Sequence, residues 1–162
     1  MQNKATATPM TSHYHKIQKV VDGDGFIVTN QKGEEEEVRL YGIDAPEVKK
    51  CRKLLQDERE THLPGQLLME LGRKSFHFLL ELCPPGTLCT LVQEQNNTTD
   101  PYGRKLAYAF LPDGRCVNEI VVRAGYAKPY NKVFCEQLHS YQELHLEART
   151  AQRGLFQWVS SF

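Results

Sequence analysis

Apolar and polar residues alternate in several short runs along this chain of 162 residues. An alternation with a period of two is typical of a strand that buries one face, and turns rich in Gly, Pro and Asp separate the runs. The pattern predicts five strands, at residues 16–21, 26–29, 37–43, 87–92 and 105–110. The second and third runs flank a polar loop that contains glycine, which indicates an antiparallel hairpin.

Helical spacing of apolar residues predicts three helices, at residues 67–82, 117–124 and 136–152. Pro84 ends the first, Gly125 stops the second, and the third ends before Gly154. Gly72 interrupts the first pattern, so that helix either runs through the glycine or begins there. Residues 49–65 are charged and irregular, and no element is predicted in them.

Five strands with three helices predict an α+β fold with a mainly β core. This arrangement is compatible with a small closed barrel such as the five-stranded Greek-key barrel of the OB-fold. The length suits one domain with a single core. The predicted domain covers residues 14–157, between a flexible tail at residues 1–13 and a short C-terminal tail at residues 158–162.

Composition narrows the class of protein. Hydrophobic content of 40% is ordinary for a globular domain, and no apolar run approaches the ~20 residues of a membrane span. Residues 1–12 lack the apolar segment of a secretory signal, although a signal removed upstream leaves the localisation open. The 20 basic and 20 acidic side chains cancel, which disfavours a purely electrostatic nucleic-acid binder more than an enzyme.

The five cysteines form no Cys-x-x-Cys pair, which argues against a structural zinc site. We expect them to be small buried side chains. Cys83 and Cys89 flank a Pro-Pro-Gly turn, and the sequence does not decide whether they form a disulfide. The six histidines show no spacing that suggests a ligand set.

Carboxylates gather around the predicted hairpin. If the chain reverses near residues 32–33, opposed positions sum to about 65, which places Asp24 near the end of the strand that leads to Asp44. Glu47 follows across Pro46, and proline keeps Ala45 extended. The hairpin therefore predicts one acidic cluster at the rim of the barrel.

Clustered carboxylates repel one another unless a cation lies between them. Calcium takes several oxygen ligands, which Asp24 and Asp44 offer through carboxylates and Ala45 through its carbonyl. Zinc is disfavoured because no His or Cys lies in this cluster. Arg39 and Arg104 add two groups suited to a phosphate. Either acidic segment alone is ordinary turn chemistry.

Four motifs occur in a specific order: Asp22-Gly23-Asp24, Arg39 leading into Asp44-Ala45-Pro46-Glu47, Tyr102-Gly103-Arg104, and Val117-Asn118-Glu119 running to Gly125-Tyr126-Ala127. Over residues 16–156 the chain resembles the staphylococcal nuclease (thermonuclease) family. The resemblance implies an OB-fold barrel with three helices and calcium-dependent cleavage of DNA or RNA, with one Ca²⁺ ion. The implied metal ligands are Asp24, Asp44 and Ala45, and the implied catalytic residues are Arg39, Glu47 and Arg104.

The chain departs from the family pattern in two places. Ala45 stands where threonine is common, and the tyrosines that the family often places after Lys128 are not reproduced in their spacing. Segment 48–71 is also longer than usual. Candidate substrate contacts are Tyr102, Tyr130, Lys49 and Lys50. The two lysines belong to a basic run with Arg52 and Lys53, which either attracts the nucleic-acid backbone or is a solvated loop. Tyr126 and Phe134 are further candidates for stacking on bases, but their expected role is packing in the core.

Three functions are compatible with these residues. The first is a nuclease, with a nucleic-acid partner, no membrane association and a monomeric state. The second is an inactive module of the same family that binds nucleic acid or protein, and the third is a plain OB-fold binder of single strands. The complete set of acidic residues and arginines favours the enzyme.

Overall fold

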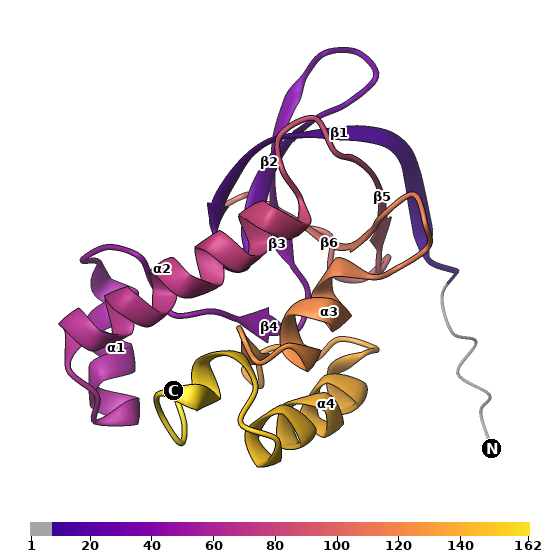
Figure 1. Ribbon diagram of the computed structural model, residues 1–162. Helices are drawn as coiled ribbons and strands as arrows, with labels where there is room; N and C mark the ends of the chain where they lie inside the picture. Colours follow the sequence, from indigo (N-terminus) through magenta and orange to yellow (C-terminus); the bar gives the residue numbers. More distant parts are fainter. Residues whose placement is uncertain (1–7) are drawn as a thin grey trace.

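The computed structural model describes residues 8–162, in which five strands close into a barrel in the order β1-β2-β3-β6-β5 (Figure 1). Their bounds are β1 Met10–Asp22, β2 Gly25–Thr29, β3 Glu35–Leu40, β5 Leu88–Gln93 and β6 Lys105–Phe110. Neighbouring strands are antiparallel except β3 and β6, which are parallel. The predicted α+β fold with an OB-like barrel is confirmed.

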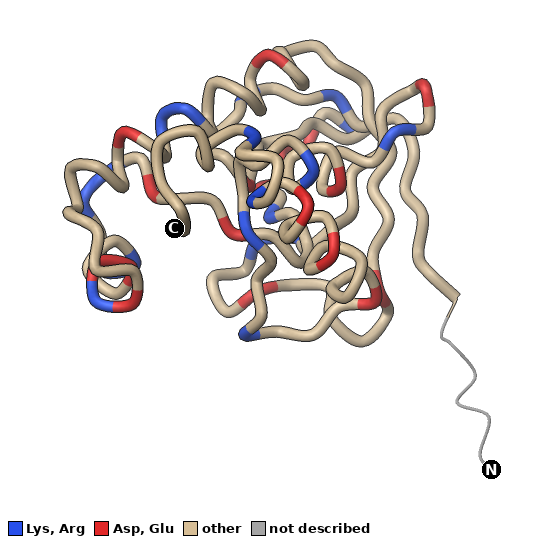
Figure 2. The backbone as a smooth tube through the Cα atoms, turned by 60° about the horizontal axis from the view of Figure 1, so that its bottom comes forward, with Lys and Arg blue, Asp and Glu red and all other residues tan. Residues whose placement is uncertain are grey.

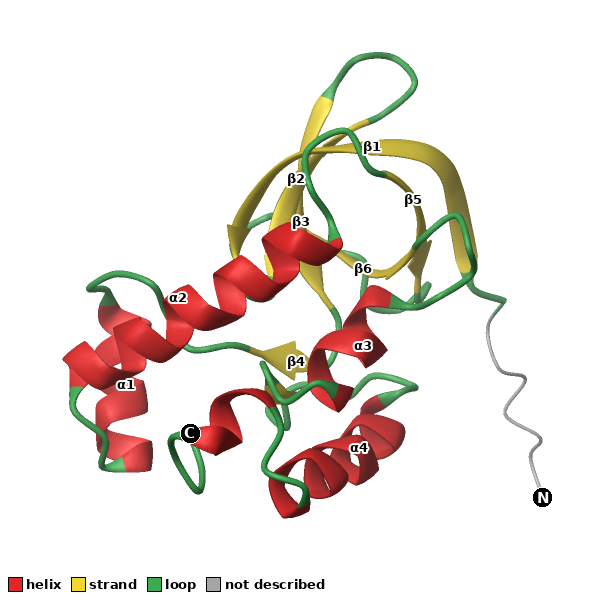
Figure 3. Ribbon diagram, in the orientation of Figure 1, coloured by secondary structure: helices red, strands yellow, loops and turns green. Residues whose placement is uncertain are grey.

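The helices lie together below the barrel in the view of Figures 1 and 3. They are α1 Arg52–Thr61, α2 Gly65–Leu82, α3 Val117–Arg123, α4 Leu138–Thr150 and the 3₁₀ turn η1 Gly154–Gln157. The two-residue strands β4 (Ile43–Asp44) and β7 (Lys128–Pro129) pair between barrel and helices.

The prediction of three helices was one helix short, because α1 lies in the segment predicted to be irregular. Of its ten residues only Leu54 and Asp57 are buried. A helix with one buried apolar side chain leaves almost no apolar periodicity in its sequence.

Helix α2 runs through Gly72 without a break, so the glycine marks a close contact. A Cβ atom at Gly72 would lie 2.5 Å from the carbonyl oxygen of Glu47 and 2.7 Å from that of Pro46. The missing side chain lets the backbone of α2 pack directly against the segment that carries Glu47.

The folded part of the chain extends beyond residues 14–157 at both ends. Met10 already pairs with Gln93 of β5, and residues 1–7 of the predicted tail lie outside the described residues. At the other end Phe162 is buried in a second apolar cluster, and the Lys128 ammonium donates to its carbonyl oxygen.

The hairpin register differs by one residue from the predicted one. Gly25 lies opposite Arg39, so opposed residues sum to 64, and the Leu40 N–H donates to the Asp24 carbonyl at 2.9 Å. Asp24 therefore lies beside the end of β3, at the rim that the sequence indicated.

All five cysteines are free thiols, which closes the question of a Cys83–Cys89 disulfide in this structure. Cys83, Cys89 and Cys135 are buried, as expected, whereas Cys51 is exposed and Cys116 is half-buried, so the expectation was wrong for Cys51. Burial raises the pKa of Cys83 and of Cys89 to about 12. No helix within residues 8–162 is long and apolar enough to cross a membrane. Basic and acidic positions are intermixed along the backbone, consistent with the zero net charge (Figure 2).

Candidate active site

A cleft of about 1070 Å³ brings together most of the predicted site residues. Its lining comes from the β1–β2 turn, β3, β4, α1, the loop before β6 and the loop after β7. The predicted residues that line it are Asp24, Arg39, Asp44, Glu47, Tyr102, Arg104 and Tyr130.

The guanidinium of Arg39 bridges the two buried aspartates. Its Nη1 lies 3.5 Å from Asp24 Oδ2 and its Nη2 lies 3.9 Å from Asp44 Oδ1. Asp24 is 5% exposed and Asp44 is 6% exposed. The pairing of β4 with β7 holds the backbone of Asp44, opposite Lys128. One delocalised cation thus faces two carboxylates from separate segments.

Asp24 also fixes the backbone at Ala45, whose N–H donates to Asp24 Oδ2 at 2.9 Å. A Cβ atom at Gly23 would lie 2.7 Å from the Cβ of Ala45 and 2.6 Å from that of Ser75. The turn therefore packs tightly on Ala45 and on α2. Burial raises the pKa of Asp24 to about 7, although the charge of Arg39 acts in the opposite direction.

Glu47 is a half-buried carboxyl group on the same side of the cleft. Burial raises its pKa to about 7, the charge of Asp24 raises it further, and the charge of Lys53 opposes both effects. Its carboxylate makes no hydrogen bond to another residue in the part of the chain that the structure describes. Such a group can exchange a proton with water near neutral pH.

Lys53 was predicted only as part of a basic run, yet its ammonium lies among the carboxylates. Its Nζ is 3.2 Å from Asp44 Oδ2, and 2.6 Å and 2.8 Å from the two carboxylate oxygens of Asp57. The four-residue spacing of Lys53 and Asp57 fits one face of a helix. That signal was missed because α1 itself was not predicted.

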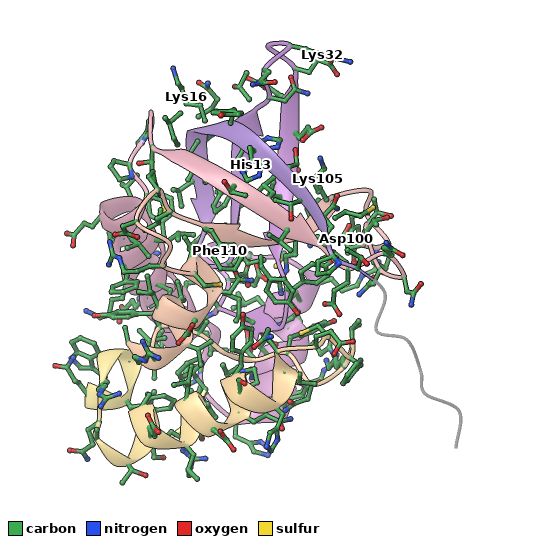
Figure 4. The ribbon with its side chains drawn as sticks, turned by 90° about the vertical axis from the view of Figure 1, so that its right-hand side faces the viewer. His13, Lys16, Lys32, Asp100, Lys105 and Phe110 are labelled. Atoms are coloured by element: carbon green, nitrogen blue, oxygen red, sulfur yellow. The ribbon has the colours of Figure 1, made fainter. Side chains whose placement is uncertain are left out.

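Arg104 is held by its own turn on another wall of the cleft. Its Nε donates to Asp100 Oδ2 at 2.6 Å, and the backbone N–H groups of Tyr102 and Arg104 both donate to Asp100 Oδ1. Gly103 has a φ of +80°, as this turn requires. Figure 4 shows Asp100 and Lys105 on the same side of the barrel, far from Lys32 at the hairpin tip. Within residues 8–162 the two terminal nitrogens of Arg104 donate to no acceptor, so they remain available to an anion.

Aromatic side chains border the cleft. The ring of Tyr130 lies 5.6 Å from the guanidinium carbon of Arg39, and Tyr102 is 85% exposed. Phe134 lines the cleft and is 72% exposed, so its predicted place in the core was wrong. It belongs to an irregular loop, where spacing carries no information on burial. Tyr126 stacks on Phe78 against the core, as expected.

Lys49 and Lys50 are exposed and do not line the cleft. The next three residues, Cys51, Arg52 and Lys53, do line the cleft.

The donor set fits a hard cation. Asp24 and Asp44 are two buried carboxylates. The carbonyl of Ala45, the residue after Asp44, accepts no hydrogen bond from residues 8–162, although Ala45 does not itself line the cleft. Oxygen ligands of this kind suit calcium. No group of three or more His, Cys, Asp or Glu side chains within the described residues is arranged to hold a metal ion, so backbone and water oxygens would have to complete the shell.

The chain matches known proteins along most of its length. A family model described as staphylococcal nuclease homologue matches residues 37–158. An uncharacterized protein of Methanocaldococcus jannaschii is 31% identical over 155 residues, which cover 92% of this chain and 74% of the relative. An uncharacterized endonuclease of Escherichia coli O157:H7 is 30% identical, with 87% of this chain and 75% of the relative covered. The thermonuclease of Staphylococcus intermedius is 26% identical, with 80% and 70% covered.

The family match covers well over half of the chain. The protein therefore belongs to the staphylococcal nuclease family.

Proposed function

We propose that this protein is a calcium-dependent nuclease that hydrolyses phosphodiester bonds of DNA or RNA. The observation that carries the proposal is the cleft in which Arg39 and Arg104 face the carboxyl groups of Asp24, Asp44 and Glu47. The names of two relatives, an endonuclease and a thermonuclease, support it.

The arginines and the glutamate have different roles in the proposed reaction. Arg104 has free terminal N–H groups, and with Arg39 it binds the phosphate oxygens as negative charge develops on them. Glu47 accepts the proton of the attacking water. Asp24, Asp44 and the Ala45 carbonyl would hold calcium, which when bound polarises a phosphoryl oxygen. The positive charge of calcium would also offset the negative charge of the acidic cluster, Asp24, Asp44 and Glu47, which would otherwise repel the phosphate.

The first test compares cleavage of single-stranded DNA with calcium and with a chelator. We expect cleavage only with calcium, because the carboxylates otherwise repel the phosphate. Equal cleavage in both conditions would contradict the proposal. Binding of DNA without cleavage in either condition would support the inactive module instead.

We further propose that Tyr102 and Tyr130 contact bases or sugars, and that Lys49 and Lys50 attract the nucleic-acid backbone. Tyr102 is exposed and Tyr130 is half-buried at the cleft, and rings in such places can stack on bases, worth ~1–3 kcal/mol per base. The lysines lie beyond the cleft, so they would act at longer range.

Reversal of both lysine charges, in the variant Lys49→Glu/Lys50→Glu, should weaken binding of single-stranded DNA. Binding should also depend less on salt, with the slope of log K against log[salt] reduced by ~0.7 for each phosphate that the protein no longer neutralises. Fluorescence anisotropy at several salt concentrations measures this slope. An unchanged slope would remove these lysines from the binding surface.

A further inference from the structure

We propose that Lys53 competes with the divalent cation for Asp44, and that Asp57 retains the lysine when the cation binds. Lys53 is then a positioning residue that sets the affinity of the metal site. The inference rests on the proposed function, because it takes Asp44 to be a metal ligand.

Asp44 already has a cationic side chain at each of its carboxylate oxygens. Its Oδ1 faces Arg39 at 3.9 Å and its Oδ2 faces Lys53 at 3.2 Å. Both oxygens of the carboxylate thus face a side-chain cation. A divalent ion that binds Asp44 must displace the ammonium from Oδ2 or lie close to its positive charge.

Asp57 gives the Lys53 ammonium a second, buried partner. This carboxylate is 5% exposed, and both of its oxygens lie within 2.8 Å of Lys53 Nζ. A buried carboxylate without a partner is costly, so Asp57 holds the ammonium regardless of what Asp44 binds. The ammonium therefore has a second carboxylate to stay with when it leaves Asp44.

The positive charge of Lys53 opposes the binding of a divalent cation nearby. The Lys53 ammonium lies within hydrogen-bond distance of the carboxylates of Asp44 and Asp57, and a lysine paired in this way is a cation at neutral pH. A unit positive charge next to a divalent ion weakens binding strongly at the reduced dielectric of a partly buried site. The pair on α1 thus makes the acidic cluster less attractive to metal than its carboxylates alone.

Isothermal titration of calcium, without substrate, tests the inference on the intact protein. Lys53→Met should bind calcium about tenfold more tightly than the wild type, or better. The matched control is Lys32→Met, which removes the same charge from an exposed side chain at the hairpin tip, outside the cleft. Its dissociation constant should stay within about twofold of the wild type.

A second variant guards against misfolding and against a mere change of net charge. Lys53→Met leaves two buried carboxylates with one fewer partner, whereas Lys53→Met/Asp57→Asn removes the ion pair together and keeps the net charge constant. The double variant should still bind calcium more tightly than the wild type. Calcium should also raise its melting temperature more than it raises that of the wild type.

The outcomes separate the two proposals. If the wild type binds calcium and neither variant binds it more tightly, the competition is overturned and the nuclease proposal stands. If no form binds calcium, the calcium requirement of the proposed function fails, and the competition fails with it.

Discussion

Replacement of Arg104 with alanine should slow cleavage of single-stranded DNA by about 10²–10³-fold, the usual cost of removing one donor to a charged transition state. The terminal nitrogens of Arg104 donate to no acceptor within residues 8–162, and the guanidinium lies 5.7 Å from the centroid of the exposed Tyr102 ring, so the free protein depends little on them. The Asp100 carboxylate that pairs with Arg104 is only 9% exposed, but it keeps the backbone N–H groups of residues 102 and 104 as donors after the substitution, so little stability should be lost. We therefore expect the melting temperature and the calcium affinity to stay nearly unchanged while the rate falls.

Arg115→Ala is a matched control for this experiment. Arg115 also donates through Nε and through its backbone N–H to one preceding aspartate, Asp113, and it does not line the cleft. Its loss should leave the rate within about twofold of the wild type, as expected for an exposed ion pair. Equal rates for both variants and the wild type would remove Arg104 from the catalytic machinery.

Glu47→Gln should lower the rate by about 10²–10⁴-fold, the range for loss of a general base. It should also change the pH profile. Burial and the charge of Asp24 raise the pKa of Glu47 to about 7, so the carboxyl group is largely protonated at pH 5 and cannot accept a proton. The wild-type rate should therefore rise with pH and level off once the group is ionised. Bound calcium favours the carboxylate and should move the midpoint below 7.

Rate measurements from pH 5 to pH 9 at saturating calcium check this expectation. Glu47→Gln should lack the rise, because glutamine does not titrate. Glu70→Gln serves as the control, since Glu70 is exposed on α2 and outside the cleft, and it should keep the wild-type profile. A profile of unchanged shape in Glu47→Gln would assign the titration to another group.

The barrel was predictable because its strands alternate in a way that burial dictates. The exact register of the hairpin was not predictable, because it depends on hydrogen bonds that the Asn30 side chain makes within the turn. The Asn30 carboxamide oxygen accepts from the N–H groups of Lys32 and Glu34, and Gly33 has a φ of +80°. With these hydrogen bonds the turn is centred on residue 32, whereas the predicted turn was centred between residues 32 and 33. Each residue of β2 therefore pairs with a residue of β3 one position earlier than predicted.

Most of the acidic and arginine side chains of the candidate site could also be placed from sequence. Pairing along the hairpin and the bend at Pro46 brought Asp24, Asp44 and Glu47 together, and the structure places them around one cleft. Lys53 could not be placed, because its position depends on a helix that buries almost no apolar surface. Side chains on irregular loops, such as Phe134, carry no periodic signal at all.

The parallel pairing of β3 with β6 has a consequence for how the protein folds. It sets Arg39 beside Leu106, two residues from Arg104, although the two arginines are 65 residues apart in the chain. Pairings at such separations form slowly, because a long loop must close before any contact rewards it. In a chain that has formed the β2–β3 hairpin but has not yet paired β6, Arg104 is not near the acidic cluster. The carboxylates of that cluster then repel a phosphate. On the proposed mechanism, the full rate of cleavage requires the closed barrel, so a newly made or partly unfolded chain should cut nucleic acid far more slowly than the folded protein.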